Sequence, residues 1–232
     1  MKKKIEQIIK QIADILIING GFLNNPGLYI GEMGLVLFFS RYYRYTQNDL
    51  YMEYCLDLFE NIQNKIHQDT PVNYKHGLAG IGSTIEYLVQ NSFFEADTDE
   101  ILEDFDRRIF YTYNIPYLPV DDIMDIAYYV NWRLSGKSAL KNEIRKFIMP
   151  QIIKYFQQHS INPALIQFIQ KSKPSIIEKK THKLCEQLIT DNIFWNIEPG
   201  IDNGLAGWGL FLLTELDGND SWFTLFPNNL PD

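Results

Sequence analysis

A short glycine-containing element recurs along the chain, and it constrains the fold more than any other feature of the sequence. Its copies are Gly31-Glu32-Met33-Gly34-Leu35, Gly77-Leu78-Ala79-Gly80-Ile81, Asp122-Ile123-Met124-Asp125-Ile126 and Gly204-Leu205-Ala206-Gly207-Trp208. Their starts are separated by 46, 45 and 82 residues, and the last interval is close to two repeats of about 41. Each copy opens an apolar stretch long enough for a buried helix. This period predicts a repeated helix–turn–helix architecture.

The hydrophobic pattern is helical along the chain, and strand-like alternation is nearly absent. Helices are expected at 4–18, 31–45, 49–67, 80–89, 97–110, 122–134, 141–156, 164–169, 175–190 and 204–216. Asn48 or Asp49 can cap one of them, and Asp97 or Thr98 another. Apolar helices alternate with amphipathic ones, so we predict a single all-α domain over residues 1–232 with about five inner/outer pairs. The segment Trp222–Pro227 is expected to be extended.

Composition argues against two classes of partner. The net charge is −8, and no basic run follows the first four residues, which disfavours nucleic acid. The N-terminal lysines and isoleucines resemble a signal peptide, but the isoleucines share one helical face, which favours an amphipathic helix packed on the domain. No segment is long and apolar enough to span a membrane.

Cys55 and Cys185 lack the spacing of a zinc site or a disulfide framework, and such isolated thiols suit the reducing cytoplasm.

The paired glycines lie one helical turn apart at the start of each apolar helix. Without side chains, they allow a neighbouring backbone to approach closely, while the amides of the first turn point outward. A phosphate-binding loop is the other reading of such glycines, but no Gly-Lys-Ser/Thr sequence follows and no strand precedes them. We therefore interpret the glycines as packing devices.

The Gly-Leu-Ala-Gly element, followed by Ile or Trp at the head of an apolar helix, resembles the repeats of the lanthionine synthetase C-like cyclases. The best match is Asn203–Leu213 together with the short tail to Pro227, and the segments Gly31–Tyr51 and Asn73–Leu88 resemble small members of that family. The resemblance covers most of the chain, with little motif evidence over 137–200. It implies an α/α toroid, in which a ring of inner helices is surrounded by outer helices, and a role in lantibiotic-type peptide maturation. The family has seven helix pairs, and this chain has room for about five.

The resemblance also implies a zinc site, which this sequence does not match. Family members hold zinc with one cysteine of a Trp-Cys-x-Gly motif and the Cys-His of a Cys-His-Gly motif, and the metal activates a substrate thiol. The pairs that precede the four elements here are Tyr29-Ile30, Lys75-His76, Val120-Asp121 and Asp202-Asn203. One histidine without thiolates is a poor zinc site. We therefore predict no metal or other cofactor and no cyclisation, and a protein that binds a precursor peptide or a modification enzyme.

In a toroid, the residues that precede the inner helices would gather at one end of the ring. The candidate site residues there are Lys75, His76, Asp121, Asp122, Asp125, Asp202 and Asn203. A histidine beside carboxylates can act as a general base or join a hard-metal site, although His76 can also serve as a hydrogen-bonding residue before a helix. Asp122 and Asp125 replace both repeat glycines, and N-cap and first-turn positions are the alternative explanation for them.

The same carboxylates support an alternative function. In a carbohydrate-active α/α-toroid enzyme, Asp121, Asp122, Asp125 and Asp202 would supply the general acid and base. A second acidic segment, Asp97–Asp106, lacks the glycine and the spacing of a calcium loop. We interpret that segment as a capped helix with a solvated face.

Overall fold

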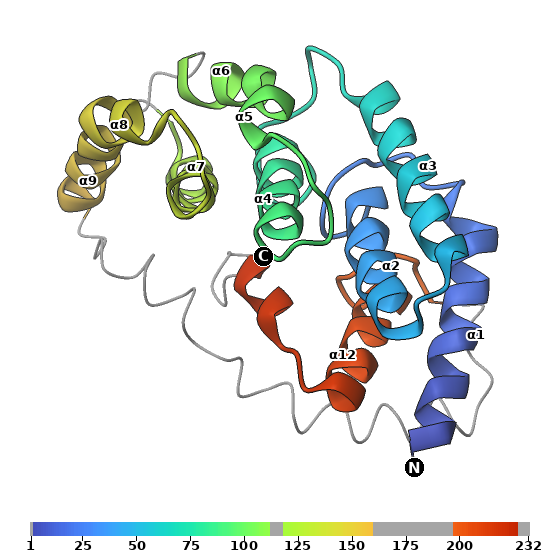
Figure 1. Ribbon diagram of the computed structural model, residues 1–232. Helices are drawn as coiled ribbons and strands as arrows, with labels where there is room; N and C mark the ends of the chain where they lie inside the picture. The colour runs from blue at the N-terminus through green and yellow to red at the C-terminus, as the bar shows by residue number, and fades with distance from the viewer. Residues whose placement is uncertain (1, 112–117, 160–196, 227–232) are drawn as a thin grey trace. The chain divides into compact units, whose positions relative to one another are not determined.

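The computed structural model describes residues 2–111, 118–159 and 197–226 (Figure 1). Every regular element in these ranges is helical, which confirms the all-α prediction for this part of the chain. The helices predicted at 164–169 and 175–190, and Cys185 with them, lie outside the described residues. The chain divides into two compact units, which are Met1–Asp69 with Pro174–Ser221 and Thr70–Lys173 with Trp222–Asp232.

The first unit contains one nearly buried helix with neighbours on several sides. Its described helices are α1 (Lys2–Gly20), α2 (Glu32–Thr46), α3 (Asp49–Lys65) and α12 (Leu205–Asp217). Helix α2 packs against α3 and α12, and it is buried continuously from Glu32 to Tyr42. Helix α3 buries only one stripe of residues, spaced at three or four positions, so α2 and α3 form an inner/outer pair.

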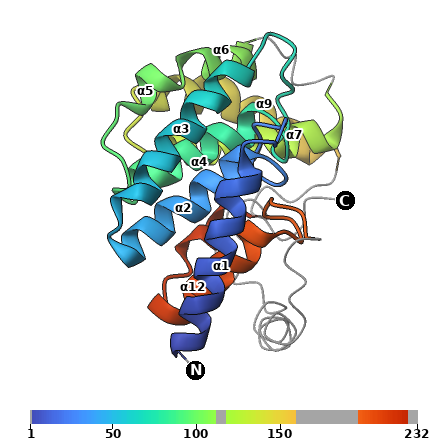
Figure 2. The same ribbon diagram turned by 90° about the vertical axis from the view of Figure 1, so that its right-hand side faces the viewer.

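The N-terminal helix is amphipathic, as predicted. Helix α1 packs chiefly on α12 and also touches α2 (Figures 1 and 2). Its buried positions include Ile8, Ile9, Ile12, Ile15 and Leu16. Because each such side chain contributes roughly 1.5–3 kcal/mol when fully buried, this stripe is enough to hold the helix on the unit.

The second unit is built around two buried helices that lie side by side. Its described helices are α4 (Leu78–Gln90), α5 (Thr98–Ile101), α6 (Glu103–Tyr111), α7 (Val120–Ser135), α8 (Lys141–Glu143) and α9 (Met149–Gln158). Helices α4 and α7 make the most extensive pairing, and α5 and α6 lie against α4. The π-helical turn η2 (Ile144–Ile148) links α8 to α9, so the predicted helix 141–156 is present with one widened turn.

Several predicted details are confirmed and three are wrong. Asn48 and Asp97 cap their helices through side-chain oxygens, as expected. The single helix predicted at 97–110 is broken at Leu102, and both halves contribute a carboxylate to a buried arginine described below.

Helix α7 begins at Val120 rather than at residue 122, because Pro119 is its N-cap and proline suits a helix start. Residues 222–227 were expected to be extended, but most of them belong to the 3-10 helix η4 (Ser221–Leu225).

The same glycine-to-ring contact joins the buried helices in both units. A Cβ atom at Gly82 of α4 would lie 2.6 Å from the ring of Tyr129 on α7, and one at Gly209 of α12 would overlap the ring of Phe38 on α2. Both glycines follow the second glycine of their element by two residues, and both rings lie seven residues after the start of theirs. Equivalent positions of the sequence repeat therefore make equivalent packing contacts in the two units.

Candidate functional site

Each glycine-headed helix is sealed at its N-terminus by the loop that precedes it. The first two amides of the helix donate to carbonyls seven residues earlier, at 2.8 to 3.3 Å: Glu32 to Asn25, Met33 to Pro26, Leu78 to Pro71, Ala79 to Val72, Leu205 to Glu198 and Ala206 to Pro199. Amides bonded in this way are not available to an anion. The packing interpretation is confirmed, and the expectation that these amides point outward is wrong.

The glycine at each of these helix starts is required for space. Gly31, Gly77 and Gly204 have φ angles of −122°, −129° and −112°, which any residue can adopt. A Cβ atom at each of them would lie closer than 3.0 Å to a loop carbonyl oxygen, a separation that real Cβ atoms essentially never show. The glycines therefore let the loop close over the helix end.

Within each unit, the segments that precede neighbouring repeats are hydrogen-bonded to one another or to the neighbouring helix. In the first unit, the carbonyl of Tyr29 accepts from the amides of Ile201 and Asp202, at 2.7 and 3.0 Å. In the second unit, the amide of Tyr74 donates to Oδ2 of Asp125 at 2.8 Å. The second contact places a carboxylate from α7 against the loop before α4.

Asp125 is a buried carboxyl whose protonation is poised near neutral pH. Its side chain is 8% exposed, and because α7 starts at Val120, Asp125 lies in the second turn rather than in the first. Burial raises its pKa to about 6, although the Tyr74 amide opposes this shift. The charges of Asp122 and Asp121 contribute to this raised pKa, and the charge of Lys75 opposes it. A carboxyl with such a pKa can hold or release a proton under physiological conditions.

The structure brings Lys75, Asp121 and Asp122 close enough to Asp125 for their charges to act on its pKa. We call Asp121, Asp122 and Asp125 the acidic group. Asp121 and Asp122 occupy the first turn of α7, where the helix dipole favours negative charge. The predicted N-cap role for Asp122 is wrong, because the N-cap is Pro119.

The remaining sequence candidates, which are His76, Asp202 and Asn203, do not all belong to one unit. The amide of His76 donates to Oδ1 of Asn73 at 2.7 Å, a local bond that shapes the loop before α4. Asp202 and Asn203 belong to the first unit, and both are exposed. Asn203 has φ of 51°, a left-handed conformation that asparagine tolerates better than most residues.

A buried tyrosine hydroxyl lies next to the acidic group. Tyr128, one turn after Asp125, is 1% exposed, and its ring packs edge-on against that of Tyr74 with centroids 5.6 Å apart. Burial raises the pKa of Tyr128, and the charge of Asp125 adds to the shift. Its hydroxyl has no hydrogen-bond partner within the described part of the protein. Burying an unbonded hydroxyl costs about 1–3 kcal/mol, so this atom is available to a ligand or a water molecule.

The residues that the structure describes do not fit the zinc site that the resemblance implies. Cys55 is fully buried in α3, with its sulfur 3.6 Å from Ser40 Oγ and 3.7 Å from the carbonyl of Val36. Burial raises the pKa of the Cys55 thiol to about 12. Over residues 2–111, 118–159 and 197–226, no three side chains of the types that bind metals are grouped to hold an ion.

Cys55 should therefore be almost unreactive in the folded protein. In a Cys185→Ser variant at pH 8, we expect a disulfide reagent to label Cys55 at least about 100-fold more slowly than after unfolding in urea, because thiolate content and access both fall. The rate of thiol release measures this directly. Equal rates in the folded and unfolded protein would contradict the burial of Cys55.

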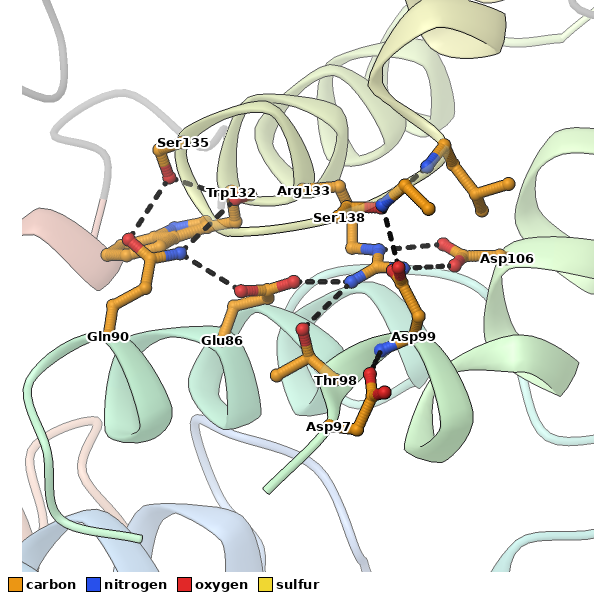
Figure 3. Close-up of polar contacts among 12 residues, drawn as sticks. Glu86, Gln90, Asp97, Thr98, Asp99, Asp106, Trp132, Arg133, Ser135 and Ser138 are labelled. Atoms are coloured by element: carbon orange, nitrogen blue, oxygen red, sulfur yellow. Dashed lines mark hydrogen bonds and ion pairs between the residues drawn. The ribbon is translucent and has the colours of Figure 1, made fainter. Parts of the chain in front are cut away.

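The second unit contains a buried ion cluster that was not predicted from the sequence. Arg133 on α7 is fully buried, and its guanidinium binds Glu86, Asp99 and Asp106 (Figure 3). Its distances to Asp99 and Asp106 are 2.6 and 2.7 Å. Further donors to these carboxylates are Gln90, Tyr129 and the amide of Ala139. We call Arg133 and its three carboxylates the arginine cluster.

The arginine cluster corrects the prediction that the segment Asp97–Asp106 is a solvated face. Asp106 is 2% exposed, and Asp99 is half-buried, although other acids of the segment face solvent. The buried cluster could have been predicted from Glu86 and Arg133, because each is a charged residue inside an otherwise apolar helix. Charges at such positions are buried only when they are paired. The cluster ties α4, α5, α6 and α7 together.

Removing the charge of Asp125 should stabilise the protein at neutral pH. The folded pKa of Asp125 lies above the unfolded value, so its favourable contribution is present at low pH and is lost as the pH rises through about 6. The Asp125→Asn variant keeps an acceptor for Tyr74, and we expect its advantage over wild type to be about 2 kcal/mol larger at pH 7.5 than at pH 4. Urea unfolding at both pH values measures this. The same difference at both would contradict the buried, protonatable state.

No helix in the described part of the chain combines the length and the apolar character needed to cross a membrane. Comparisons with protein-family models, with curated proteins and with solved structures gave no match to the chain.

Proposed function

We propose that the chain is a lanthionine synthetase C-like α/α-toroid protein that binds a peptide in peptide maturation and does not carry out zinc-dependent cyclisation. Its binding surface is the acidic group at the start of α7, and its ligand is a lysine- or arginine-bearing segment of a precursor peptide or of a modification enzyme. The glycine-headed loops form the scaffold that holds this surface.

Two packing features support a ring of repeated helices. Helix α12 packs against α2, so the last glycine-headed helix neighbours the first one within a unit. The contacts of Gly82 with Tyr129 and of Gly209 with Phe38 use equivalent positions of the repeat. The first contact joins two successive repeats, and the second joins the last repeat to the first, which is the pattern expected of a closed repeat array.

The observation that carries the proposed binding role is the unbalanced charge around Asp125. The charges of Asp121 and Asp122 act on Asp125 to raise its pKa, and the charge of Lys75 acts to lower it. Keeping Asp125 charged in a buried position costs stability, and the nearby hydroxyl of Tyr128 is buried without a hydrogen-bond partner among the described residues. Local costs of this kind are concentrated at binding and catalytic sites. A cationic group would relieve the repulsion between the carboxylates.

A titration with a synthetic peptide tests the proposed binding role. The probe is a twelve-residue peptide with four lysines, and the control is the same peptide with every lysine acetylated. We expect calorimetric binding of the lysine peptide to weaken about tenfold in the double variant Asp121→Asn/Asp122→Asn, since two charges are lost. Glu100→Gln, which removes an exposed acid elsewhere in the unit, should leave the affinity unchanged. Equal binding of the acetylated peptide would contradict the proposal.

A second candidate function, hydrolysis of a carbohydrate, is favoured by one observation. The pKa of Asp125 is raised to about 6 beside two carboxylates, and glycoside hydrolysis uses one protonated and one ionised carboxyl. If oligosaccharides release reducing ends with the wild-type protein and not with Asp125→Asn, the enzyme reading holds and the binding reading fails. Metal analysis of the purified protein completes the test, because one zinc ion per chain would contradict the metal-free proposal.

A further inference from the structure

A cleft of about 500 Å³ lies between α1 and the C-terminal part of α2, within the first unit. This volume is in the range of small-molecule sites. Ile9 is fully buried beneath the cleft, and Tyr42, which is 5% exposed, and the part-exposed Tyr45 supply its aromatic surface. Lys3, Glu6 and Lys10 supply polar groups from α1. The cleft is separate from the acidic group, which belongs to the second unit.

The aromatic side of the cleft is held in place by contacts outside it. The ring of Tyr42 stacks on that of Phe38 and packs against that of Tyr51, with centroids 5.7 and 4.5 Å apart. The hydroxyl of Tyr45 donates to Oε1 of Glu6 at 2.7 Å. This bond fixes the Tyr45 ring as a wall and engages the one carboxylate among the lining residues. A preorganised aromatic surface favours a flat, apolar ligand group.

The charge at this end of the unit is opposite to that of the whole protein. Residues 2–10 contain Lys2, Lys3, Lys4 and Lys10 against Glu6, a local net charge of +3 in a chain of net charge −8. Lys10 bridges to Asp14 at 2.7 Å, but both side chains are at least half exposed, so this pair holds the ammonium weakly. The cleft is therefore lined by two lysines as well as by two tyrosines.

We propose that the cleft binds a small aromatic carboxylate, with its ring against Tyr42 and Tyr45 and its carboxylate at Lys3 and Lys10. The flat ring matches the tyrosine surface, and the anionic group matches the lysines. The glycine elements, the acidic group and the peptide ligand proposed above have no part in this binding.

Calorimetry with two matched probes tests the proposal. The probes are 3-(4-hydroxyphenyl)propanoate and its uncharged carboxamide, titrated into the full chain at low ionic strength. We expect saturable 1:1 binding of the carboxylate, weakened by roughly fivefold or more in the carboxamide and in the Lys3→Gln/Lys10→Gln variant. The control, Lys2→Gln/Lys4→Gln, removes the same charge from lysines that do not line the cleft and should keep the affinity within about twofold. Absence of saturable binding, equal binding of the carboxamide, or equal weakening in the control would overturn the proposal.

Discussion

Replacing Arg133 by methionine should lower the free energy of unfolding by about 4 kcal/mol. The guanidinium is the cation that binds Glu86, Asp99 and Asp106, and its side chain is fully buried. Methionine fills a similar volume but leaves two buried carboxylates without a positive partner. Removing one member of a buried ion network is far more costly than the net contribution of the intact network. Urea unfolding at pH 7.5 measures the loss.

Arg107 provides the matched control for this prediction. It lies on α6, its side chain is 72% exposed, and it bonds the exposed Asp104. Exposed pairs contribute about 0–1 kcal/mol, so Arg107→Met should change the free energy of unfolding by less than about 1 kcal/mol. Equal effects of Arg133→Met and Arg107→Met would contradict the buried arginine cluster.

Replacing Gly77, the N-cap residue of α4, by alanine should destabilise the protein by about 2 to 3 kcal/mol. The added Cβ atom would overlap the carbonyl of Pro71, which accepts from the amide of Leu78 at 2.9 Å. The loop would have to withdraw, and the first turn of α4 would lose its partners. We expect the loss in thermal or urea unfolding to be similar for Gly31→Ala and Gly204→Ala, because their loops make the same contacts.

Gly21→Ala is the control for the loop glycines. A Cβ atom at Gly21 meets nothing within 4 Å, and this residue follows α1 rather than opening a repeat helix. Its stability should stay within about 0.5 kcal/mol of wild type or rise slightly. If Gly77→Ala were as mild as Gly21→Ala, the loops would not be closed on the helix ends as described.

The helical fold could be predicted from the sequence because burial and periodicity are local signals. The apolar stretch after Gly31 and the stripe in the N-terminal segment each identify their helix directly, and Asn48 identifies a helix start. The two-residue error at the start of α7 has a local cause as well. The helix was predicted to begin at Asp122 because that residue aligns with the first repeat glycine, but Pro119 is the N-cap in the structure.

The candidate site was less predictable, because it depends on contacts between elements. The repeat placed Asp125 near the loop before α4, but its burial and its bond to Tyr74 follow from the packing of α4 against α7. The partners of Arg133 come from three other helices, and no spacing in the sequence connects them. A charged residue in an apolar helix indicates that its charge is paired, but the sequence does not identify the partner residues.

Two quantities measured on one variant test whether Asp125 serves binding rather than stability. Wild type and Asp125→Asn are compared at pH 7.5 for their affinity for the four-lysine peptide and for their free energy of unfolding. We expect the variant to bind the peptide about tenfold more weakly and yet to have a higher free energy of unfolding, because the buried charge has been removed. A variant with unchanged affinity and reduced stability would contradict the binding role of Asp125, since this residue would then be a structural hydrogen-bond acceptor.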